Sequence, residues 1–242
     1  MIIEADLSAA EWRVAAFLSQ DVTAIDEIKQ GHDAHADNCV NVMGLPLTKN
    51  NRTDAKVFLF RILFGGTYMG MHKDPRMPNF SKTKWKSIIK NFYQKYIDLS
   101  NWHEQLIISA NQHGFYTSPT GRILSFKKVM NKYSGVKEYP RGQILNYPVQ
   151  SLAADIIHIA MIEAYQMVRE QTTYTKFIVQ VHDSMVWDAP DSEVEIVCEI
   201  NKFVFDNLTT YIKKYYDFDF NVPLTGEICY GKDWGSTDVL YR

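Results

Sequence analysis

The sequence predicts an α+β fold in which a small antiparallel sheet is combined with long helices. Two short apolar runs, residues 2–7 and 177–183, each lead to an aspartate, as expected for short buried strands. Residues 52–65 and 149–170 are predicted to be helices. With 242 residues, of which 46% are hydrophobic and 13% aromatic, the chain is long enough for one large or two small packed units.

The first eighty residues are predicted to be mainly helical. Ser8 is expected to be the N-cap of the first helix, because its hydroxyl can accept a bond from a free backbone N–H. Gly65 and Gly66 are expected to end the third helix, and Pro75 and Pro78 predict a loop. In order, we expect a strand at 2–7, helices at 8–18, 33–42 and 52–65, and a loop at 71–80.

The remaining residues are predicted to mix helices with strands. Gly114 is a stop signal for a long helical stretch, and Pro119-Thr120-Gly121 predicts the turn of a hairpin. The acidic residues of Asp191-Ser192-Glu193 are expected to cap a helix N-terminus. In order, we expect helical structure at 82–112 with a break at 98–101, a hairpin at 117–126, a helix at 149–170, a strand-turn-strand at 177–188, a helix at 191–206 and a strand at 221–230.

The two aspartates at the ends of the apolar runs, Asp6 and Asp183, form the first candidate site. Two carboxylates held side by side repel each other, and one takes up a proton unless a cation lies between them. Mg²⁺ suits such a pair, because it takes one or two carboxylates and completes its shell with water and substrate phosphates. A single aspartate after a strand is also a common cap or turn residue, so the pair alone leaves both interpretations open.

A second candidate site lies on the helix predicted at residues 52–65. Arg52, Lys56, Phe60 and Phe64 are spaced by four and therefore form one stripe along that helix. A stripe that is cationic at one end and aromatic at the other suits a ligand with a polyphosphate and a flat base. Arginine can bind phosphate oxygens with two N–H groups, and lysine adds a mobile charge. An ordinary amphipathic helix with two solvated charges has the same pattern.

Six motifs in this order resemble the C-terminal polymerase region of family A DNA polymerases, the DNA polymerase I class. Each motif is short, but together they span about 230 residues of the chain. They are Asp6-Leu7-Ser8-Ala9-Ala10-Glu11-Trp12-Arg13, Asp33-Ala34-His35 with Gly44-Leu45-Pro46-Leu47, the stretch from Arg52 to Gly65, Gly121-Arg122 with Asn146 to Asp155, His182-Asp183-Ser184, and Pro223-Leu224 with Gly231-Lys232-Asp233-Trp234.

The resemblance implies a polymerase palm, a small antiparallel sheet with flanking helices, together with a helical fingers subdomain. Residues 1–30 and 116–242 would form the palm, and residues 31–115 would form the fingers and the helices that follow. The implied activity is template-directed DNA synthesis from deoxynucleoside triphosphates. Asp6, Asp183 and the backbone carbonyl of Leu7 would hold two Mg²⁺ ions, which Mn²⁺ could replace.

Further residues acquire implied roles from the same resemblance. Arg52, Lys56 and His35 would contact the triphosphate, and Lys56 would protonate the leaving pyrophosphate. Glu11 would pack against the 2′ position of the sugar and exclude ribonucleotides. Contacts with the incoming base and sugar would come from Phe60 and Phe64, and contacts with primer and template DNA from Arg122, Asn146, Gln150 and His182.

The sequence departs from the family pattern at several positions. Phe64 replaces a tyrosine, so no hydroxyl is available there to bond Glu11. Ser184 replaces an acid, which leaves two catalytic carboxylates. Asp6 lies close to the first residue, whereas the family places a thumb before this motif and often an exonuclease before that. Three interpretations are open: a split enzyme whose second polypeptide supplies thumb and exonuclease, a truncated piece of a longer enzyme, and a complete but reduced enzyme that holds DNA weakly. We expect the first, for which a phage origin is suitable.

The distribution of charge agrees with nucleic-acid binding, although the net charge is −2. Residues 49–90 contain ten basic side chains against Asp54 and Asp74, and residues 122–141 contain six against Glu138. Residues 187–242 are acidic. Two cationic regions and an acidic remainder fit a phosphate-binding face and a solvated surface. No apolar run reaches eighteen residues, so we expect no membrane contact and a cytoplasmic location, in the host cytoplasm for a phage protein.

Other functions remain open on the sequence alone. The chain could be a non-catalytic module, derived from a polymerase, that binds primed DNA or a partner subunit. A two-metal nuclease is a further alternative, against which the triphosphate-binding stripe argues. His35 could cap a helix, and His32 with His35 imitates a zinc-ligand spacing without the further ligands that a zinc site requires.

Overall fold

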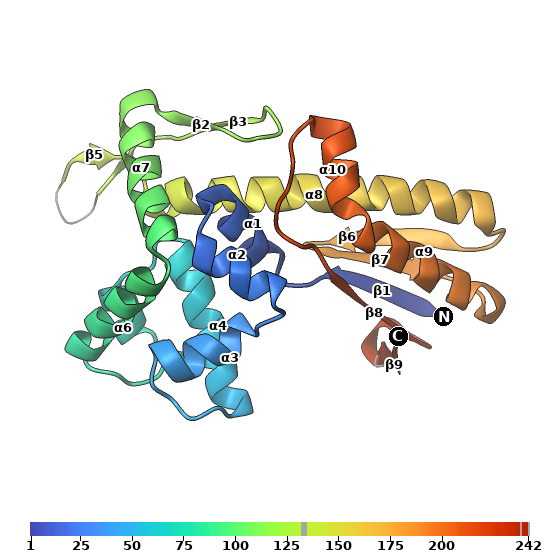
Figure 1. Ribbon diagram of the computed structural model, residues 1–242, viewed down its shortest axis with the longest axis horizontal. Coiled ribbons are helices and arrows are strands. Elements are labelled where there is room, and N and C mark those ends of the chain that lie inside the picture. Colours follow the sequence, from blue (N-terminus) through green and yellow to red (C-terminus); the bar gives the residue numbers. More distant parts are fainter. Residues whose placement is uncertain (132–134, 238, 242) are drawn as a thin grey trace. The chain divides into compact units, whose positions relative to one another are not determined.

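A five-stranded antiparallel sheet carries both predicted aspartate strands in the computed structural model, which describes residues 1–131, 135–237 and 239–241 (Figure 1). The strands lie in the order β6-β7-β1-β8-β9. Their bounds are β1 (Ile2–Leu7), β6 (Lys176–Val181), β7 (Ser184–Asp188), β8 (Gly226–Gly231) and β9 (Val239–Leu240). This sheet belongs to one of two compact units, formed by Met1–Val14 and Ser151–Arg242, while Ala15–Gln150 form the other. The predicted α+β class is confirmed.

The N-terminal strand β1 is a central strand of this sheet. It pairs with β7 on one side and with β8 on the other. Ile3, Ala5 and Leu7 alternate along the strand and are fully buried, so that one face of β1 is committed to the core. Glu4 and Asp6 alternate with them and lie on the opposite face. The period of two along the strand therefore directs the carboxylate of Asp6 away from the core.

Three helices complete the first unit, α9 (Val194–Asp206), α10 (Leu208–Tyr216) and the later part of α8 (Arg141–Gln171). Helix α9 packs closely on the sheet. A Cβ atom at Gly226 would lie 2.2 Å from the ring of Phe205, so only glycine allows this approach. The buried Trp187 indole donates from Nε1 to the side-chain oxygen of Asn201 at 3.2 Å, which joins β7 to α9.

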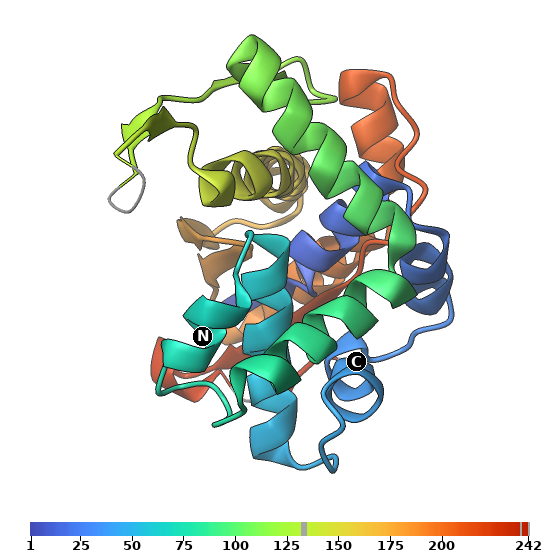
Figure 2. The ribbon, with the colours of Figure 1, turned by 90° about the vertical axis from the view of Figure 1, so that its left-hand side faces the viewer.

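The second unit is mainly helical, and its helices are also visible in Figure 2. Two short hairpins accompany the helices, β2 (Phe115–Thr117) with β3 (Ile123–Ser125), and β4 (Val129–Met130) with β5 (Lys137–Glu138). Between Ala15 and Gln150 the complete helices are α2 (Val22–Lys29), α3 (Ala34–Asp37), the π-helix η1 (Asn38–Val42), α4 (Lys49–Leu63), α5 (Tyr68–Lys73), α6 (Lys82–Lys95) and α7 (Ile97–His113).

Aromatic side chains form the core between α4 and α6. The ring of Phe58 stacks on Trp85 with centroids 6.2 Å apart, and its edge meets Phe92 at 5.6 Å. Tyr96 packs against Phe92 at 5.0 Å. All four side chains are fully buried. Because this contact occupies one face of α4, the opposite face of the helix can carry charged side chains and aromatic side chains that are not part of the core.

Most predicted elements are confirmed, including the hairpin around Pro119-Thr120-Gly121 and the two strands around Asp183. The expected burial of the strand before Asp183 was wrong, because β6 is an edge strand whose Ile178 is 53% exposed. Gly114 has a left-handed φ of 76° and ends α7 as predicted. Helices α2 and α10 and the β4–β5 hairpin were not predicted from the sequence. No helix of the described residues is long and apolar enough to cross a membrane.

Several predicted boundaries were wrong. The first helix, α1 (Ala10–Ser19), starts two residues late, so that Ala9, with a left-handed φ of 50°, and not Ser8, occupies the N-cap position. The Ser8 N–H donates to the Thr225 carbonyl. Three elements begin elsewhere than predicted: α4 at 49 rather than 52, α8 at 141 rather than 149, and β8 at 226 rather than 221. Helix α5 includes residues 71–73, which were predicted to be loop, and the break before α7 lies at 96 rather than at 98–101.

The expected cap at Asp191-Ser192-Glu193 was also wrong. Neither the 3₁₀ turn η2 (Asp191–Glu193) nor α9 receives a side-chain cap from this segment. The Glu193 carboxylate instead accepts hydrogen bonds from the backbone N–H groups of Thr173, Tyr174 and Thr175. These residues precede β6, so Glu193 holds the loop that leads into that strand.

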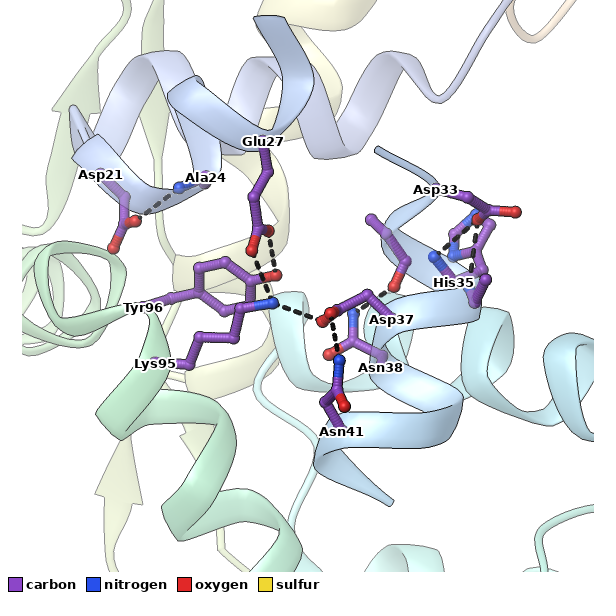
Figure 3. Close-up of polar contacts among 12 residues, drawn as sticks. Asp21, Ala24, Glu27, Asp33, His35, Asp37, Asn38, Asn41, Lys95 and Tyr96 are labelled. Atoms are coloured by element: carbon purple, nitrogen blue, oxygen red, sulfur yellow. Dashed lines mark hydrogen bonds and ion pairs between the residues drawn. The ribbon is translucent and has the colours of Figure 1, made fainter. Parts of the chain in front are cut away.

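Asp21 joins two helices of the second unit that are far apart in the sequence. Its Oδ1 accepts from the Ala24 N–H at 2.9 Å and caps α2, as Figure 3 shows. Its Oδ2 accepts from the Asp98 and Leu99 N–H groups, each at 3.0 Å, at the start of α7. Asp21 is only 1% exposed, so water cannot easily replace its carboxylate as the acceptor for these N–H groups.

We predict that Asp21→Ala lowers the free energy of unfolding by about 2–4 kcal/mol, because two helix caps are lost in a buried place. Urea denaturation followed by circular dichroism measures this. Asp26→Ala is the matched control on the exposed side of α2, with an expected change within about 0.5 kcal/mol. Equal losses in the two variants would contradict the double-cap assignment.

Candidate active site

Asp6 and Asp183 meet at one end of the five-stranded sheet. Asp6 pairs with Ser184 in the register of β1 and β7, which places it next to Asp183 in the β6–β7 turn. The Leu7 N–H donates to the Asp183 carbonyl at 3.0 Å and ties the two segments together. His182 occupies the turn with a left-handed φ of 54°, its carbonyl accepts from the Gln180 side chain, and its own side chain is exposed.

The electrostatics of Asp6 distinguish it from an ordinary turn residue. Burial, followed by repulsion from Asp183 and a hydrogen bond with it, raises the pKa of Asp6 from 3.8 to about 7. Glu4 and Glu227 raise this pKa further. Glu4 shares a face of β1 with Asp6, and Glu227 lies opposite Asp6 in the register of β1 and β8. The site therefore disfavours two ionised carboxylates in the absence of a cation.

The donor chemistry of this pair fits a divalent cation. Mg²⁺ needs only one or two protein carboxylates, because water and substrate phosphates supply its other ligands. Among the residues that the structure describes, no group of three or more His, Cys, Asp or Glu side chains is arranged to hold a metal ion.

Sequence reasoning missed Glu4, Glu227 and Arg13 as part of this region. The period of two along β1 could have identified Glu4, whereas Glu227 depends on the register with β8. Arg13 donates to the Ser8 carbonyl at 2.8 Å, to the Pro223 carbonyl at 2.6 Å and to the Thr225 hydroxyl at 2.9 Å. It therefore fixes the turn that follows Asp6. Glu11 lies in the first turn of α1 and is half-buried.

The predicted stripe of cationic and aromatic side chains is present on α4, in the second unit. Arg52 and Lys56 are exposed, and the Phe60 and Phe64 rings are half-buried. These two rings stack with centroids 6.3 Å apart and an interplanar angle of 29°, and the Lys56 Nζ lies 5.9 Å from the Phe60 centroid. Residues on the other side of the helix, Phe58 and Leu59 among them, are fully buried.

The aromatic end of the stripe borders a shallow hollow of about 380 Å³. Phe60 and Phe64 contribute to its wall, and Arg61 and Arg76 bring positive charge to it. Both arginines are paired with Asp74, with 2.8 Å between Arg76 and this carboxylate. The surface around α4 thus offers a flat apolar wall next to cationic groups within one unit.

His35 lies close to this stripe, on the short helix α3. Its ring centroid is 6.3 Å from that of Phe60. Burial, followed by the charge of Arg52, lowers the pKa of His35 and so favours the neutral imidazole. Its Nδ1 is buried without a hydrogen-bond partner among the described residues. Asp33, and not His35, caps α3 by accepting from the His35 and Ala36 N–H groups, as Figure 3 shows.

Arg122, Asn146 and Gln150 also lie in the second unit. Arg122 is exposed after the turn of the β2–β3 hairpin, and its carbonyl accepts from the Ser118 N–H. Asn146 and Gln150 are separated by four residues on α8 and therefore share a face of that helix. The side-chain oxygen of Asn146 is buried without a hydrogen-bond partner among the described residues.

A strand-end carboxylate pair and a cationic, aromatic helix are the parts expected of a nucleotide polymerase. The fold agrees. The structure superimposes with a TM-score of 0.83 on the POL domain of Pol1 from M. smegmatis, solved in complex with DNA primer-template and dNTP. The match covers 98% of this chain and 40% of that chain at 21% identity, and it shows that the fold is shared.

Curated relatives agree with the fold. The chain is 28% identical over 240 residues to DNA polymerase I of Caldicellulosiruptor bescii, and 25% identical over 237 residues to that of Geobacillus stearothermophilus. These matches cover 98% and 97% of the chain but only 27% and 26% of the two relatives, so the chain spans about a quarter of their length. The model of DNA polymerase family A matches residues 1–236, and the chain belongs to this family.

The raised pKa of Asp6 predicts how stability depends on pH in the absence of metal. Because its pKa rises from 3.8 to about 7 on folding, its favourable contribution is complete below pH 3.8 and is lost as the pH rises through 7. We predict that Asp6→Asn raises the Tm by about 2–4 °C at about pH 8.5, after allowance for solvent screening, and by less at about pH 5.

Differential scanning fluorimetry in chelator measures this difference, with Asp219→Asn as a control at an exposed carboxylate. The same Tm gain at both pH values would contradict the raised pKa.

Proposed function

We propose that this chain is the catalytic part of a template-directed DNA polymerase. It would transfer a nucleotide from a deoxynucleoside triphosphate to the 3′-hydroxyl of a primer. The observation that carries the proposal is the pair formed by Asp6 and Asp183, whose mutual repulsion disfavours ionisation of both at neutral pH and is relieved by a cation. Membership of DNA polymerase family A supports it.

Asp6 and Asp183, with the backbone carbonyl of Leu7, would hold two Mg²⁺ ions, or Mn²⁺ in their place. When bound, such ions lower the pKa of a coordinated hydroxyl and neutralise charge on the phosphates. The carboxylates themselves orient the reacting groups, and the bond from the Leu7 N–H to the Asp183 carbonyl keeps the two strand ends in register. Glu4 and Glu227 increase the negative potential and so favour cation binding.

The second unit would bind the nucleotide. Arg52, Lys56 and His35 have the chemistry to donate to triphosphate oxygens. The two cations among them, Arg52 and Lys56, would stabilise negative charge that develops on the transferred phosphoryl group. Lys56 would also protonate the leaving pyrophosphate. The stacked Phe60 and Phe64 rings offer an apolar surface for the sugar and base of the nucleotide.

The remaining predicted residues would select the sugar and contact DNA. Glu11 would exclude a ribonucleotide, because a 2′-hydroxyl would crowd its half-buried carboxylate. Asn146 has a buried oxygen without a partner among the described residues, which a DNA group could satisfy. Contacts with primer and template DNA would come from Arg122, Asn146, Gln150 and His182. They would be made to DNA groups that are the same for every base sequence.

The arrangement into subdomains belongs to the same proposal. Residues 1–30 and 116–242 would act as the palm and residues 31–115 as the fingers. A second polypeptide that supplies thumb and exonuclease, a phage origin and a cytoplasmic location stay predictions. Addition of a fraction from the source organism to the purified chain would test for such a polypeptide.

We predict that the purified chain extends a primer with Mg²⁺ and four deoxynucleotides, and that Asp183→Ala lowers the rate about 10³-fold or more. Asp219→Ala, at a carboxylate that is 84% exposed, is the control and should extend normally. Gel analysis of a labelled primer measures this. Equal extension by both variants would contradict the role of Asp183. Failure of the unmodified chain, with and without source fractions, would favour a non-catalytic module that binds primed DNA or a partner.

Lys56→Ala tests the assignment of the nucleotide-binding stripe. We predict that kcat/KM for the nucleotide falls about 10–100-fold, because a cation that stabilises the transferred phosphoryl is lost. Lys29→Ala on α2 removes an exposed lysine of the same unit, outside the cationic region 49–90, and should leave kcat/KM unchanged. Steady-state kinetics on a fixed primer-template measure both. An unchanged kcat/KM for Lys56→Ala would count against the stripe.

A further inference from the structure

Arg52, the predicted triphosphate ligand, is already bound to a carboxylate. Its Nε donates to the Asp33 Oδ2 at 2.7 Å. The side chains are 46% and 42% exposed, so an incoming anion can reach the pair. Ion pairs with this exposure are weak, and the median is about 0–1 kcal/mol. The contact is therefore strong enough to be populated and weak enough for a polyphosphate to displace it.

The Asp33 carboxylate is oriented toward Arg52 by its second role. Its Oδ1 accepts from the His35 N–H at 2.9 Å and from the Ala36 N–H at 3.1 Å. With one oxygen committed to the N-terminus of α3, the other oxygen is directed at the guanidinium. The direction of this carboxylate is thus set by the backbone of α3 and does not depend on the rotamer of Arg52 alone.

The other end of α3 is held independently, as Figure 3 shows. The Lys95 ammonium binds Asp37 and lies 2.7 Å from a Glu27 oxygen. The Tyr96 hydroxyl donates to the other Glu27 oxygen at 2.8 Å, and the Asn41 amide donates to Asp37 at 2.7 Å. The two ion pairs of Lys95 are half-buried and connect α3 with α2 and α6. Displacement of Asp33 from Arg52 therefore leaves α3 anchored, with the carboxylate ready to bind the guanidinium again.

We propose that Asp33 is an internal competitor for Arg52 that sets the affinity of the site for polyphosphates. This inference rests on the proposed function and deepens it. An arriving triphosphate exchanges one carboxylate contact for several phosphate oxygens of higher charge, so it displaces Asp33. After transfer, Asp33 competes with the leaving pyrophosphate for the same guanidinium and shortens its residence. The carboxylate weakens nucleotide binding and promotes product release.

Asp33→Asn separates this role from the helix cap. Asparagine caps helices as well as aspartate does, so the contacts with the His35 and Ala36 N–H groups can remain. Its NH₂ group would replace Oδ2 opposite the Arg52 Nε–H, where two donors cannot bond. The variant therefore releases Arg52 and removes one negative charge next to the bound phosphates.

We expect Asp33→Asn to bind both a deoxynucleoside triphosphate and inorganic pyrophosphate about 2–5-fold more tightly, as measured by isothermal titration calorimetry in Mg²⁺. A structural defect would weaken binding, so a gain of affinity distinguishes the two effects. Asp26→Asn, at an exposed carboxylate on α2, makes the same change in net charge and should leave affinity unchanged. In an Arg52→Gln background, Asp33→Asn should have less than half its effect on affinity.

Each outcome decides between defined alternatives. Equal or weaker binding by Asp33→Asn, while the unmodified chain binds both ligands, overturns the competitor role and leaves the proposed function intact. An equal gain in the Asp26→Asn variant overturns it as well, because net charge alone then explains the effect. If the unmodified chain binds neither ligand, the proposed triphosphate role of Arg52 fails, and the inference fails with it.

Discussion

The pairing of β1 between β7 and β8 is the constraint on which the rest of the first unit depends. The apolar face of β1, formed by Ile3, Ala5 and Leu7, is removed from water in the observed register. That register places Asp6 opposite Ser184 on one side and Glu227 on the other. A shift by one residue would bury Asp6 and expose Leu7. The same apolar burial that stabilises the sheet therefore also positions its carboxylates.

This arrangement stores electrostatic repulsion at the end of the sheet. Asp6 faces the charges of Asp183, Glu4 and Glu227, and burial adds to their effect on its pKa. A protein that needed only a stable sheet would gain from apolar or neutral side chains here. In the proposed reaction, a cation bound together with a polyphosphate would relieve this repulsion.

The second unit separates packing from recognition on the two faces of one helix. Phe58 and Leu59 fix α4 in the core, so its other face can carry charge and flat rings without loss of stability. An exposed cation on this face can still have a partner, since Arg52 forms an ion pair with Asp33. Short-range ion pairs of this kind keep a binding group ordered while leaving it exchangeable, in contrast to the half-buried contacts of Lys95 that hold α3.

By itself, the sequence determined the elements whose signals are local. Short apolar runs identified the strands around Asp6 and Asp183, spacing by four identified the stripe on α4, and Gly114 identified a helix end. The ordered motifs were sufficient to indicate the polymerase family. Local signals were weaker for α2 and α10, and Pro148 concealed the first turns of α8, since a proline inside a helix resembles a boundary.

Only the tertiary structure decided which of these residues are neighbours. The contacts of Asp6 with Asp183 and Glu227, of Arg13 with Pro223 and Thr225, and of Asp33 with Arg52 join segments that are distant along the chain. Periodicity reports which face a side chain occupies, but strand register and helix packing arise from burial of the whole core. The electrostatics of the candidate site follow from that register, and no local pattern encodes them.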